Sequence, residues 1–353
     1  MVTKRERVCV GMSGGVDSSV AAYLLLEQGY QVIGLTFRNW PQDCISRAED
    51  KCCGPQAVTD ARMVAHRLGI PHYVVDEIAE FQREVIDYFV AEYQRGRTPN
   101  PCVVCNEKIK FGSFWRRAAE LGATKIATGH YARVEPGNPP RLFRGRDPRK
   151  DQSYFLFSLR PEQLARALFP LGEMSKEETR AIARKLGLKT QDKVESQEIC
   201  FVPDKDYVRF LREGAKIADR PGEIVTRDGQ VLGQHPGIHY FTIGQREGLR
   251  LGGQREPRYV MALDAEANRV VVGSAAELMR DQFEIADCHW LAEPTGEVTV
   301  KIRYNHPGCA AEVRRLDETR ARVHLREPQR AITPGQAAVV YRGDEVLGGG
   351  WIC

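Results

Sequence analysis

A glycine-rich turn near the start of the chain has the residue types of a phosphate-binding loop. It lies within residues 10–26, VGMSGGVDSSVAAYLLL, between a short apolar run and a helical pattern. Gly14 and Gly15 let the backbone approach a phosphate and offer N–H groups to it, and the following helix adds the positive end of its dipole. Asp17 stands where a carboxylate could help to hold Mg²⁺. The segment therefore predicts a site for the phosphate chain of a nucleotide.

Three of the ten cysteines have the spacing or context of reactive thiols. Cys102 and Cys105 form a C-x-x-C pair in RTPNPCVVCNEKIKF, just before a predicted helix whose N-terminus would lower their pKa values and favour thiolate. Cys200 follows far along the chain in SQEICF. We expect these three thiols to carry metal or sulfur chemistry, because a disulfide framework is not expected without a secretory signal.

The other cysteines are assigned structural roles. Cys9 lies in an apolar strand and is expected in the core. We interpret Cys44, Cys52 and Cys53 as reduced thiols of a loop, with an accessory metal or sulfur-relay site as the alternative, and treat the rest as structural: Cys288, Cys309 and Cys353.

The order of strands and helices in the first part of the chain predicts an α/β fold. Strands are expected at 7–10, 31–37, 73–75 and 125–128, and helices at 17–28, 55–68, 78–93, 107–121, 162–169 and 176–186. This alternation predicts a Rossmann-like, doubly wound parallel sheet with helices on both faces. Short alternating runs from Glu284 onward predict a small all-β barrel. The expected domains are 1–205, a small mixed central domain at 206–277, and the β-barrel at 278–353.

Composition narrows the class of protein. With 353 residues, 42% of them hydrophobic and 28% charged, the chain is not disordered, collagenous or a coiled coil. The net charge of +4 does not by itself demand a polyanionic partner. No apolar run approaches the ~18 residues that span a bilayer, and the N-terminus lacks an apolar signal segment. We therefore expect a cytoplasmic protein with no membrane partner.

The glycine-rich turn differs from two common nucleotide loops. It lacks the G-x-x-x-x-G-K-[ST] pattern of a Walker A loop and the G-x-G-x-x-G fingerprint of dinucleotide-binding folds. Instead, S-G-G-x-D-S at the first strand-to-helix turn resembles the PP-loop of ATP pyrophosphatases, which split ATP between the α and β phosphates and adenylate a substrate. The resemblance implies that ATP lies across Gly11, Met12, Ser13, Gly14, Gly15, Val16, Asp17 and Ser18.

Five separated segments together resemble the tRNA-specific 2-thiouridylase family. They are GMSGGVDSS, TPNPCVVCN, ATGHYAR, KDQSYFL and SQEICF, and the similarity continues through FTIGQREGL (241–249) into the closing β domain. The resemblance implies that the C2 oxygen of the wobble uridine (U34) of tRNA is adenylated and then replaced by sulfur, with release of AMP. It implies ATP and Mg²⁺ as cofactors, tRNA as partner, and a cysteine desulfurase or relay protein as sulfur donor.

The same resemblance assigns the sulfur chemistry, with one departure. In the family, the cysteine matching Cys200 receives persulfide sulfur, and the one matching Cys105 is the nucleophile that then forms a disulfide with it. Here Cys102 replaces an aspartate found in many members. Three thiolates could hold a [4Fe–4S] cluster whose open iron delivers hydrosulfide. We favour this route, with the persulfide route as the alternative; zinc is less favoured because it usually needs a fourth ligand.

The resemblance also implies contacts to ATP and to tRNA. Phe37 and Gly129 would line the adenosine site, although a core role for Phe37 is equally expected. A flipped target base would meet Asn100, Pro101, Cys102 and His130. The basic stretch 141–150 suits phosphate contacts. Residues 281–353, with nine Lys/Arg and eleven Asp/Glu, are expected to recognise the shape of the RNA and a few bases rather than bind it by charge alone. The further implied tRNA contacts are Lys150, Asp151, Gln152, Arg303, Tyr304 and Gln336.

Two other functions fit part of the sequence. Another PP-loop ligase or amidotransferase, acting on a small metabolite, would use the glycine-rich turn but leave Cys105 and Cys200 idle. A non-enzymatic iron–sulfur or zinc RNA-binding protein would use the cysteines but leave the turn unexplained. The thiouridylase hypothesis uses both features.

Overall fold

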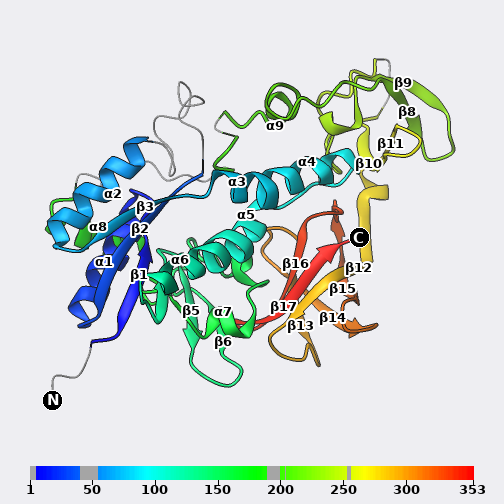
Figure 1. Ribbon diagram of the computed structural model, residues 1–353. Helices are drawn as coiled ribbons and strands as arrows, with labels where there is room; N and C mark the ends of the chain where they lie inside the picture. The colour runs from blue at the N-terminus through cyan, green and yellow to red at the C-terminus, as the bar shows by residue number, and fades with distance from the viewer. Residues whose placement is uncertain (1–4, 40–54, 189–198, 203, 253–255) are drawn as a thin grey trace. The chain divides into compact units, whose positions relative to one another are not determined.

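The computed structural model describes residues 5–39, 55–188, 199–202, 204–252 and 256–353, and Figure 1 labels many of their helices and strands. Contacts between Cα atoms divide the chain into two compact units. Unit 1 comprises Met1–Val85, Cys102–Lys205 and Asp344–Val346. Unit 2 comprises Ile86–Pro101, Asp206–Gly343 and Leu347–Cys353. Cys44, Cys52 and Cys53 lie outside the described residues.

Unit 1 is built on a five-stranded parallel sheet, whose parallel order and first four strands the sequence predicts. Its central strand, β1 (Arg7–Gly11), is buried along its middle and pairs with a strand on each side. A strand buried from both faces is expected to read as a continuous apolar run, and RVCVG does so. The other strands, in the order β3-β2-β1-β4-β7, are β3 (His72–Asp76), β2 (Gln31–Arg38), β4 (Lys125–Ala127) and β7 (Ala167–Leu168).

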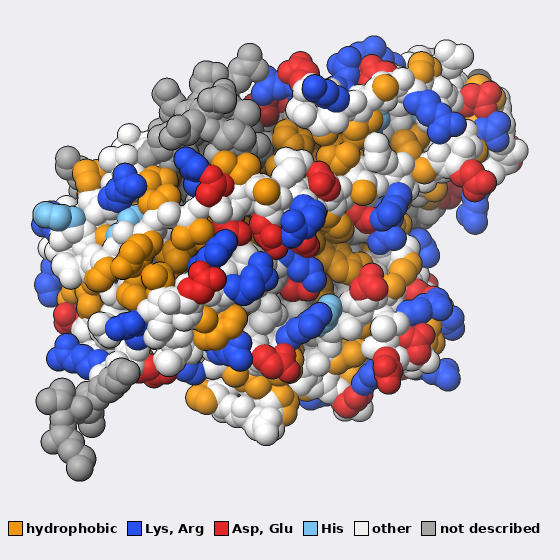
Figure 2. All heavy atoms as spheres, in the orientation of Figure 1, with side chains coloured by type: hydrophobic (Ala, Val, Ile, Leu, Met, Phe, Trp, Pro, Cys, Tyr) orange, Lys and Arg blue, Asp and Glu red, His pale blue; other side chains and the backbone are white. Residues whose placement is uncertain are grey.

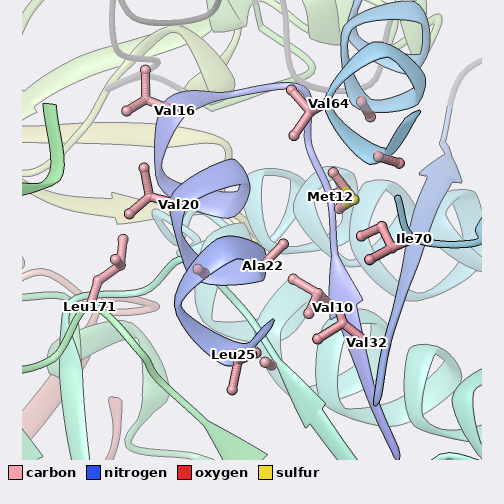
Figure 3. Packing of buried hydrophobic residues seen from close by; sticks show 14 of the residues in the cluster. Val10, Met12, Val16, Val20, Ala22, Leu25, Val32, Val64, Ile70 and Leu171 are labelled. Atoms are coloured by element: carbon pink, nitrogen blue, oxygen red, sulfur yellow. The ribbon is translucent and has the colours of Figure 1, made fainter. Parts of the chain in front are cut away.

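Three helices pack together over one face of this sheet (Figures 1 and 3). They are α1 (Val16–Glu27), α2 (Pro55–Leu68) and α8 (Lys176–Lys185), close to the predicted bounds. Val20 and Leu25 of α1 belong to the same buried cluster as Val10 and Val32 of the strands, and Figure 3 labels all four. This packing fixes the direction in which α1 leaves the glycine-rich turn.

The predicted helix over 78–93 is present, with a π-helical segment in its middle. It consists of α3 (Ile78–Phe81), η2 (Gln82–Ile86) and α4 (Asp87–Gln94). Phe81, Val85 and Phe89 are buried, as the helical spacing predicts. The boundary between the two units falls within this continuous run, after Val85.

The helix predicted to begin at Glu107 begins earlier. It starts as α5 (Pro101–Val104) and continues as the π-helical η3 (Cys105–Ser113) and α6 (Phe114–Glu120). Proline is favoured at a first helical position, because its φ angle is preset and its missing N–H is not needed there. The prediction that Cys102 and Cys105 precede a helix is therefore wrong: both lie inside the helical run.

The helix predicted at 162–169 is also wrong over its second half. α7 (Pro161–Leu164) is followed by strand β7, whose Ala167 and Leu168 pair with β4. The N–H of Ile126 donates to Arg166 O at 2.9 Å, and that of Thr128 to Leu168 O at 3.2 Å. Hydrogen bonds to the open edge of β4 stabilise this segment as a strand by more than its weak helical preference would stabilise a helix.

A hairpin completes unit 1. It is formed by β5 (Ala132–Glu135) and β6 (Arg141–Arg144) and precedes the 3-10 helix η4 (Ser153–Leu156). Strand β6 also pairs antiparallel with Glu345 and Val346, the first part of β17 (Glu345–Ile352). Arg141 reinforces this pairing through an ion pair with Glu345 (Nε–Oε1 2.8 Å).

Unit 2 contains a small sheet and a closed antiparallel barrel, as predicted. In the barrel, pairing of β12 with β17 closes the order β12-β15-β14-β13-β16-β17. Inward-facing residues such as Val300, Val323 and Val340 fill its core. The barrel strands are β12 (Met279–Trp290), β13 (Val298–Lys301), β14 (Cys309–Arg315), β15 (Ala321–Arg330), β16 (Ala337–Arg342) and β17.

The smaller sheet of unit 2 has the order β10-β11-β8-β9. Its strands are β8 (Gly222–Thr226), β9 (Val231–His235), β10 (Tyr259–Asp264) and β11 (Arg269–Gly273). Short helical segments flank it: α9 (Tyr207–Arg209), η6 (Phe210–Gly214), η7 (Ile238–Tyr240) and η8 (Ala276–Leu278). Among the described residues, no helix is long and apolar enough to cross a bilayer.

Candidate active site

The glycine-rich turn joins β1 to α1 and is held in shape by its own residues. Gly14 has a φ of +68°, and a Cβ at this position would lie 2.3 Å from the carbonyl oxygen of Ala57, so only glycine fits. The hydroxyl of Ser18 accepts from the N–H of Ser13 (3.2 Å), and Ser19 donates to Gly15 O (2.7 Å). The turn is thus preorganised around backbone N–H groups at a helix N-terminus, where anions bind.

Two residues of the predicted ATP segment direct their side chains into the core. Met12 is 2% exposed, and the hydroxyl of Thr36 donates to its carbonyl oxygen at 2.6 Å. Val16 packs in the same apolar cluster. These two positions therefore offer only backbone groups to a ligand, whereas Ser13 is exposed.

Phe37 and Gly129 lie at the carboxyl ends of strands that flank β1. The ring of Phe37 is half-buried and makes an edge contact with Phe114 (centroids 5.4 Å apart). A Cβ on Gly129 would lie 2.8 Å from Asp17 C and Ser18 N, so a side chain there would collide with the first turn of α1. The structure thus brings Phe37, Gly129 and the turn to one edge of the sheet, the usual binding edge of open α/β folds.

The carboxylate of Asp17 is one end of a partly buried ion pair that the sequence analysis missed. Nζ of Lys176 lies 2.7 and 2.9 Å from its two oxygens, and the hydroxyl of Tyr131 donates to Oδ1 at 2.9 Å. The side chain of Lys176 is 7% exposed and that of Asp17 is 33% exposed. No short-range spacing could reveal this pair, although the capping box of Ser175 and Glu178 does place Lys176 in the first turn of α8.

The two thiol-bearing segments both adjoin α3. Cys105 opens η3, which packs against α3. The ring of Phe201, next to Cys200, makes an edge contact with Phe81 of α3 at 6.0 Å. Cys102, Cys105 and Cys200 are each partly exposed. Both segments therefore approach the same short helix with accessible sulfur.

The π-helical turn that begins at Cys105 is supported from outside. The side-chain amide of Gln163 donates to two of its carbonyls, those of Glu107 and Phe111, each at 3.0 Å. Asn106 donates to Phe155 O at 3.0 Å and links the turn to the KDQSYFL segment. π-Helical turns leave carbonyls poorly paired and are frequent at functional sites, so these contacts fix the backbone that carries the thiol.

The metal prediction is not supported by the arrangement of the side chains. In the part of the chain that the structure describes, which includes Cys102, Cys105 and Cys200, no three His, Cys, Asp or Glu side chains are grouped to hold a metal ion. These thiols as arranged do not fit a cluster. The [4Fe–4S] group stays a prediction.

The thiols assigned to the core or to structural roles differ in exposure. Cys9 is fully buried, as predicted, and burial raises the pKa of its thiol to about 12. Burial likewise raises the pKa of Cys288 to about 12. Cys309 is buried and Cys353 is exposed. Cys9 and Cys288 are therefore poor sources of thiolate.

His130 is buried in an apolar niche with a defined proton position. Phe111 and Phe169 flank its ring, and Lys110 Nζ lies 3.4 Å from Nε2. Because an ammonium only donates, Nε2 accepts, which leaves the proton on Nδ1 to be donated to Thr128 Oγ1 (2.7 Å). Burial, and then the charge of Lys110, hold the pKa of His130 well below its usual range. The imidazole is neutral.

Two of the predicted tRNA contacts in unit 1 have structural partners. The buried carboxylate of Asp151 accepts from the N–H groups of Gly145 (3.1 Å) and Ser153 (3.0 Å). The side-chain oxygen of Gln152 accepts from the N–H of Tyr131 (3.0 Å). Both side chains therefore shape the loop that presents Lys150, which is partly exposed.

The basic stretch 141–150 is paired with acidic residues. Figure 2 shows Lys and Arg side chains interspersed with Asp and Glu over the face in view. The positive charges of the stretch are therefore partly balanced by neighbouring carboxylates. Its ion pairs are Arg141–Glu345, Arg144–Asp151, Arg146–Glu178 and Arg149–Glu177.

In unit 2, Gln336 holds the loop that leads to the predicted target-base residues. Its side-chain amide donates to the carbonyls of Thr98 (3.0 Å) and Pro99 (3.1 Å), just before the buried Asn100 and the helix-opening Pro101. Elsewhere in the barrel, Arg303 is exposed, and the ammonium of Lys301 lies 5.5 Å from the ring centroid of Tyr304.

Comparison with known proteins covers nearly the whole chain. Family models match three consecutive segments: the tRNA methyl transferase HUP domain at residues 6–204, the tRNA methyl transferase PRC-barrel domain at 208–274, and the aminomethyltransferase beta-barrel domain at 280–352. These three segments leave only short joins unmatched.

Curated relatives match at about half of all positions. The tRNA-specific 2-thiouridylase MnmA of Geobacter metallireducens is 52% identical over 357 residues, covering 99% of this chain and 97% of that protein. The protein of the same name from Acidithiobacillus ferrooxidans is 50% identical, covering 98% of each chain. That from Carboxydothermus hydrogenoformans is 50% identical, covering 99% and 98%. The chain belongs to the tRNA-specific 2-thiouridylase family.

Proposed function

We propose that this chain transfers sulfur to C2 of the wobble uridine, U34, of tRNA, with conversion of ATP to AMP and pyrophosphate. The observation that carries the proposal is the placement of the phosphate-binding turn and of the Cys105 and Cys200 segments in one compact unit, with both thiol segments beside α3. An ATP site alone fits many ligases. An ATP site together with two accessible thiols fits sulfur transfer.

The first step activates the base. The uracil O2 is a poor leaving group, so it attacks the α-phosphorus of ATP, pyrophosphate leaves, and an adenylated C2 oxygen results. The backbone N–H groups of Gly14–Ser18 and the N-terminus of α1 stabilise the negative charge of the phosphates. Asp17 would hold the Mg²⁺ that accompanies ATP, since its partly exposed carboxylate oxygens are ligands of the kind this ion prefers. Phe37 and Gly129 border the adenosine.

The second step replaces oxygen by sulfur. The terminal sulfur of a persulfide on Cys200 attacks C2, and AMP leaves with the C2 oxygen. The Cys105 thiolate then attacks the Cys200 sulfur, breaks its bond to the transferred sulfur and forms a Cys105–Cys200 disulfide. The sulfane sulfur gains the two electrons that the thiols lose, and an external dithiol later reduces the disulfide. A cysteine desulfurase or relay protein supplies the persulfide.

The alternative route delivers hydrosulfide from a [4Fe–4S] cluster held by Cys102, Cys105 and Cys200. Cys102 in place of an aspartate favours it, but the described side chains form no ligand group, and we derive no step through a cluster. Iron and acid-labile sulfide should be measured on protein purified without oxygen, for the wild type and Cys102→Ala. Iron that is lost in the variant establishes the cluster route. Absence of iron, with a Cys105–Cys200 disulfide formed on turnover, establishes the persulfide route.

The target base is proposed to reach Asn100, Pro101, Cys102 and His130. Both nitrogens of the His130 ring already have partners, Thr128 and Lys110, so His130 is proposed to border an uncharged base with a neutral ring rather than to bind it by a charge. Lys150, Asp151, Gln152, Arg303, Tyr304 and Gln336 are proposed to contact tRNA directly or to shape the loops that do. We place the protein in the cytoplasm with its tRNA substrate, and away from membranes.

The decisive experiment follows 2-thiouridine by mass spectrometry in a U34-containing tRNA transcript supplied with Mg²⁺, ATP and a sulfur donor. Cys105→Ala and Cys200→Ala should abolish thiolation but still release pyrophosphate. The matched control is Cys353→Ala, which removes an exposed thiol of the barrel and should leave thiolation unchanged. Thiolation that survives in both active-site variants would contradict the proposal.

A further inference from the structure

The ion pair between Lys176 and Asp17 joins a buried ammonium to the phosphate-binding turn. Both carboxylate oxygens lie within 2.9 Å of Nζ, and the lysine side chain is 7% exposed. Lysine is rarely this buried, because its ammonium must be desolvated. Asp17 belongs to the first turn of α1, two residues after the N-cap Gly15. The ammonium therefore stands beside the first turn of α1, to whose N–H groups the proposed function assigns the phosphates.

The backbone holds Lys176 in this place. It is the first residue of α8, after the Ser175 N-cap, and its N–H donates to Asp147 Oδ2 at 3.1 Å. Helix α8 packs against α1. Tyr131 contributes on both sides of the pair: its hydroxyl binds Asp17, and its ring lies 5.7 Å from the ammonium. The lysine can exchange partners at its tip while its backbone stays anchored.

The charge of the turn explains why such a lysine is needed. Residues 10–19, VGMSGGVDSS, contain no Lys or Arg, and their one charged residue is the acidic Asp17. A triphosphate brings several negative charges, and Mg²⁺ balances only two of them. A Walker A loop carries its own lysine for the β- and γ-phosphates. Here the cation comes from a helix 159 residues further along the chain.

We propose that Lys176 is a phosphate-binding residue of this site. When MgATP enters, its ammonium moves from Asp17 to an oxygen of the β- or γ-phosphate, and the Asp17 carboxylate, still held by Tyr131, becomes available to the metal. Lys176 then neutralises pyrophosphate as it leaves. The inference rests on the proposed use of ATP, and it assigns to the site a cation that the turn itself lacks.

Calorimetric titration of the full chain with MgATP, magnesium pyrophosphate and AMP tests this assignment. Lys176→Met should weaken binding of MgATP and pyrophosphate about tenfold or more, the usual size for a lost charge-assisted hydrogen bond, and change that of AMP less than about twofold. Lys176→Arg should restore part of the loss. The matched control is Lys185→Met, an exposed lysine in the last turn of the same helix, which should bind all three ligands as the wild type does.

A purely structural pair predicts a different pattern. If Lys176 only ties α8 to α1, Lys176→Met weakens all three ligands equally or none of them, and either result overturns the proposal. Should Lys176→Met fail to fold, Asp17→Asn decides. With the competing carboxylate neutralised, metal-free pyrophosphate should bind several-fold more tightly than to the wild type; unchanged or weaker binding overturns the proposal.

The titrations use neither tRNA nor a sulfur donor, so failure of the broader function is distinguishable. A wild type that binds ATP and pyrophosphate but forms no 2-thiouridine contradicts the proposed function alone. A wild type that thiolates tRNA, with a Lys176→Met variant that shows no selective loss, contradicts the role of Lys176 alone.

Discussion

The side-chain amide of Gln336 donates a hydrogen bond to the carbonyl oxygen of Pro99 at 3.1 Å. A second bond from the same nitrogen reaches Thr98 at 3.0 Å, and the N–H of Thr98 donates to Pro334 O at 2.9 Å. These three hydrogen bonds thus hold the loop that leads to Asn100 and Pro101 against a turn of the barrel. This contact makes Gln336 a positioning residue for the proposed target-base loop.

Replacement of Gln336 tests that role. Gln336→Ala should destabilise the protein by about 1 kcal/mol, as expected for lost hydrogen bonds to backbone carbonyls. It should also raise KM for tRNA several-fold and leave KM for ATP unchanged, because the phosphate-binding turn is in unit 1. Urea unfolding and steady-state kinetics measure both. Equal changes in the two KM values would contradict a local role.

Gly129 should tolerate no side chain. In Gly129→Ala the new Cβ would lie 2.8 Å from the backbone of Asp17 and Ser18, and neither backbone atom can give way cheaply. We expect a loss of about 1–3 kcal/mol in unfolding free energy and a marked fall in ATP affinity. Gly252→Ala is the control, since a Cβ there meets nothing within 4 Å. Wild-type ATP binding by Gly129→Ala would show that the turn has room to shift.

His130 should make the protein less stable in mild acid. Its folded-state pKa is held well below 6.5 by burial and by Lys110, so the folded protein keeps the ring neutral, while the unfolded chain takes up a proton below about pH 6.5. The free energy of unfolding should therefore fall by about 1.4 kcal/mol per pH unit from this residue as pH drops below that value. His130→Asn should lose this part of the slope. Denaturation curves between pH 7.5 and 5 that stay parallel for the two proteins would disprove the assignment.

Gln163 should govern the thiol-bearing turn. Gln163→Ala removes the donor shared by the carbonyls of Glu107 and Phe111 and should cost about 1–2 kcal/mol of stability. Because these carbonyls belong to the helical segment that Cys105 opens, the rate of alkylation of Cys105 should change while pyrophosphate binding does not. Mass-spectrometric peptide mapping after timed alkylation measures the first, and calorimetry the second. An unaltered Cys105 rate would mean that the turn is held by other contacts.

The sequence predicts those parts of the site that depend on local patterns. The turn from Gly11 to Ser18 is recognisable because glycines, hydroxyls and a helix start all occur within a few residues. The parallel sheet follows from alternating apolar strands and amphipathic helices. The start of the helix at Pro101 was missed, because a proline beside a C-x-x-C pair reads as a loop until the helix that it opens is seen.

Features that depend on distant residues could not be predicted. Lys176 lies far from Asp17 in the chain, and only the packing of α8 on α1 brings them together. The segment 167–168 forms a strand because it pairs with the edge of β4. The residues of the segment itself do not predict this pairing. The spacing of residues in the sequence also does not show which way a side chain points. The hydrogen bonds that Asp151 accepts from the backbone of Gly145 and Ser153 are therefore known only from the structure.

Because Glu345 and Val346 pair with β6, unit 1 contains residues that are synthesised much later than its glycine-rich turn. A ribosome releases the chain from its N-terminus, and domains generally fold as they emerge. Here the glycine-rich turn is made long before Glu345 and Val346, which complete the edge of its unit. A chain cut short before residue 344 would carry the whole glycine-rich turn, Cys105 and Cys200, yet would leave one edge of β6 without its partner. The fold thereby makes completion of unit 1 depend on translation through residue 346.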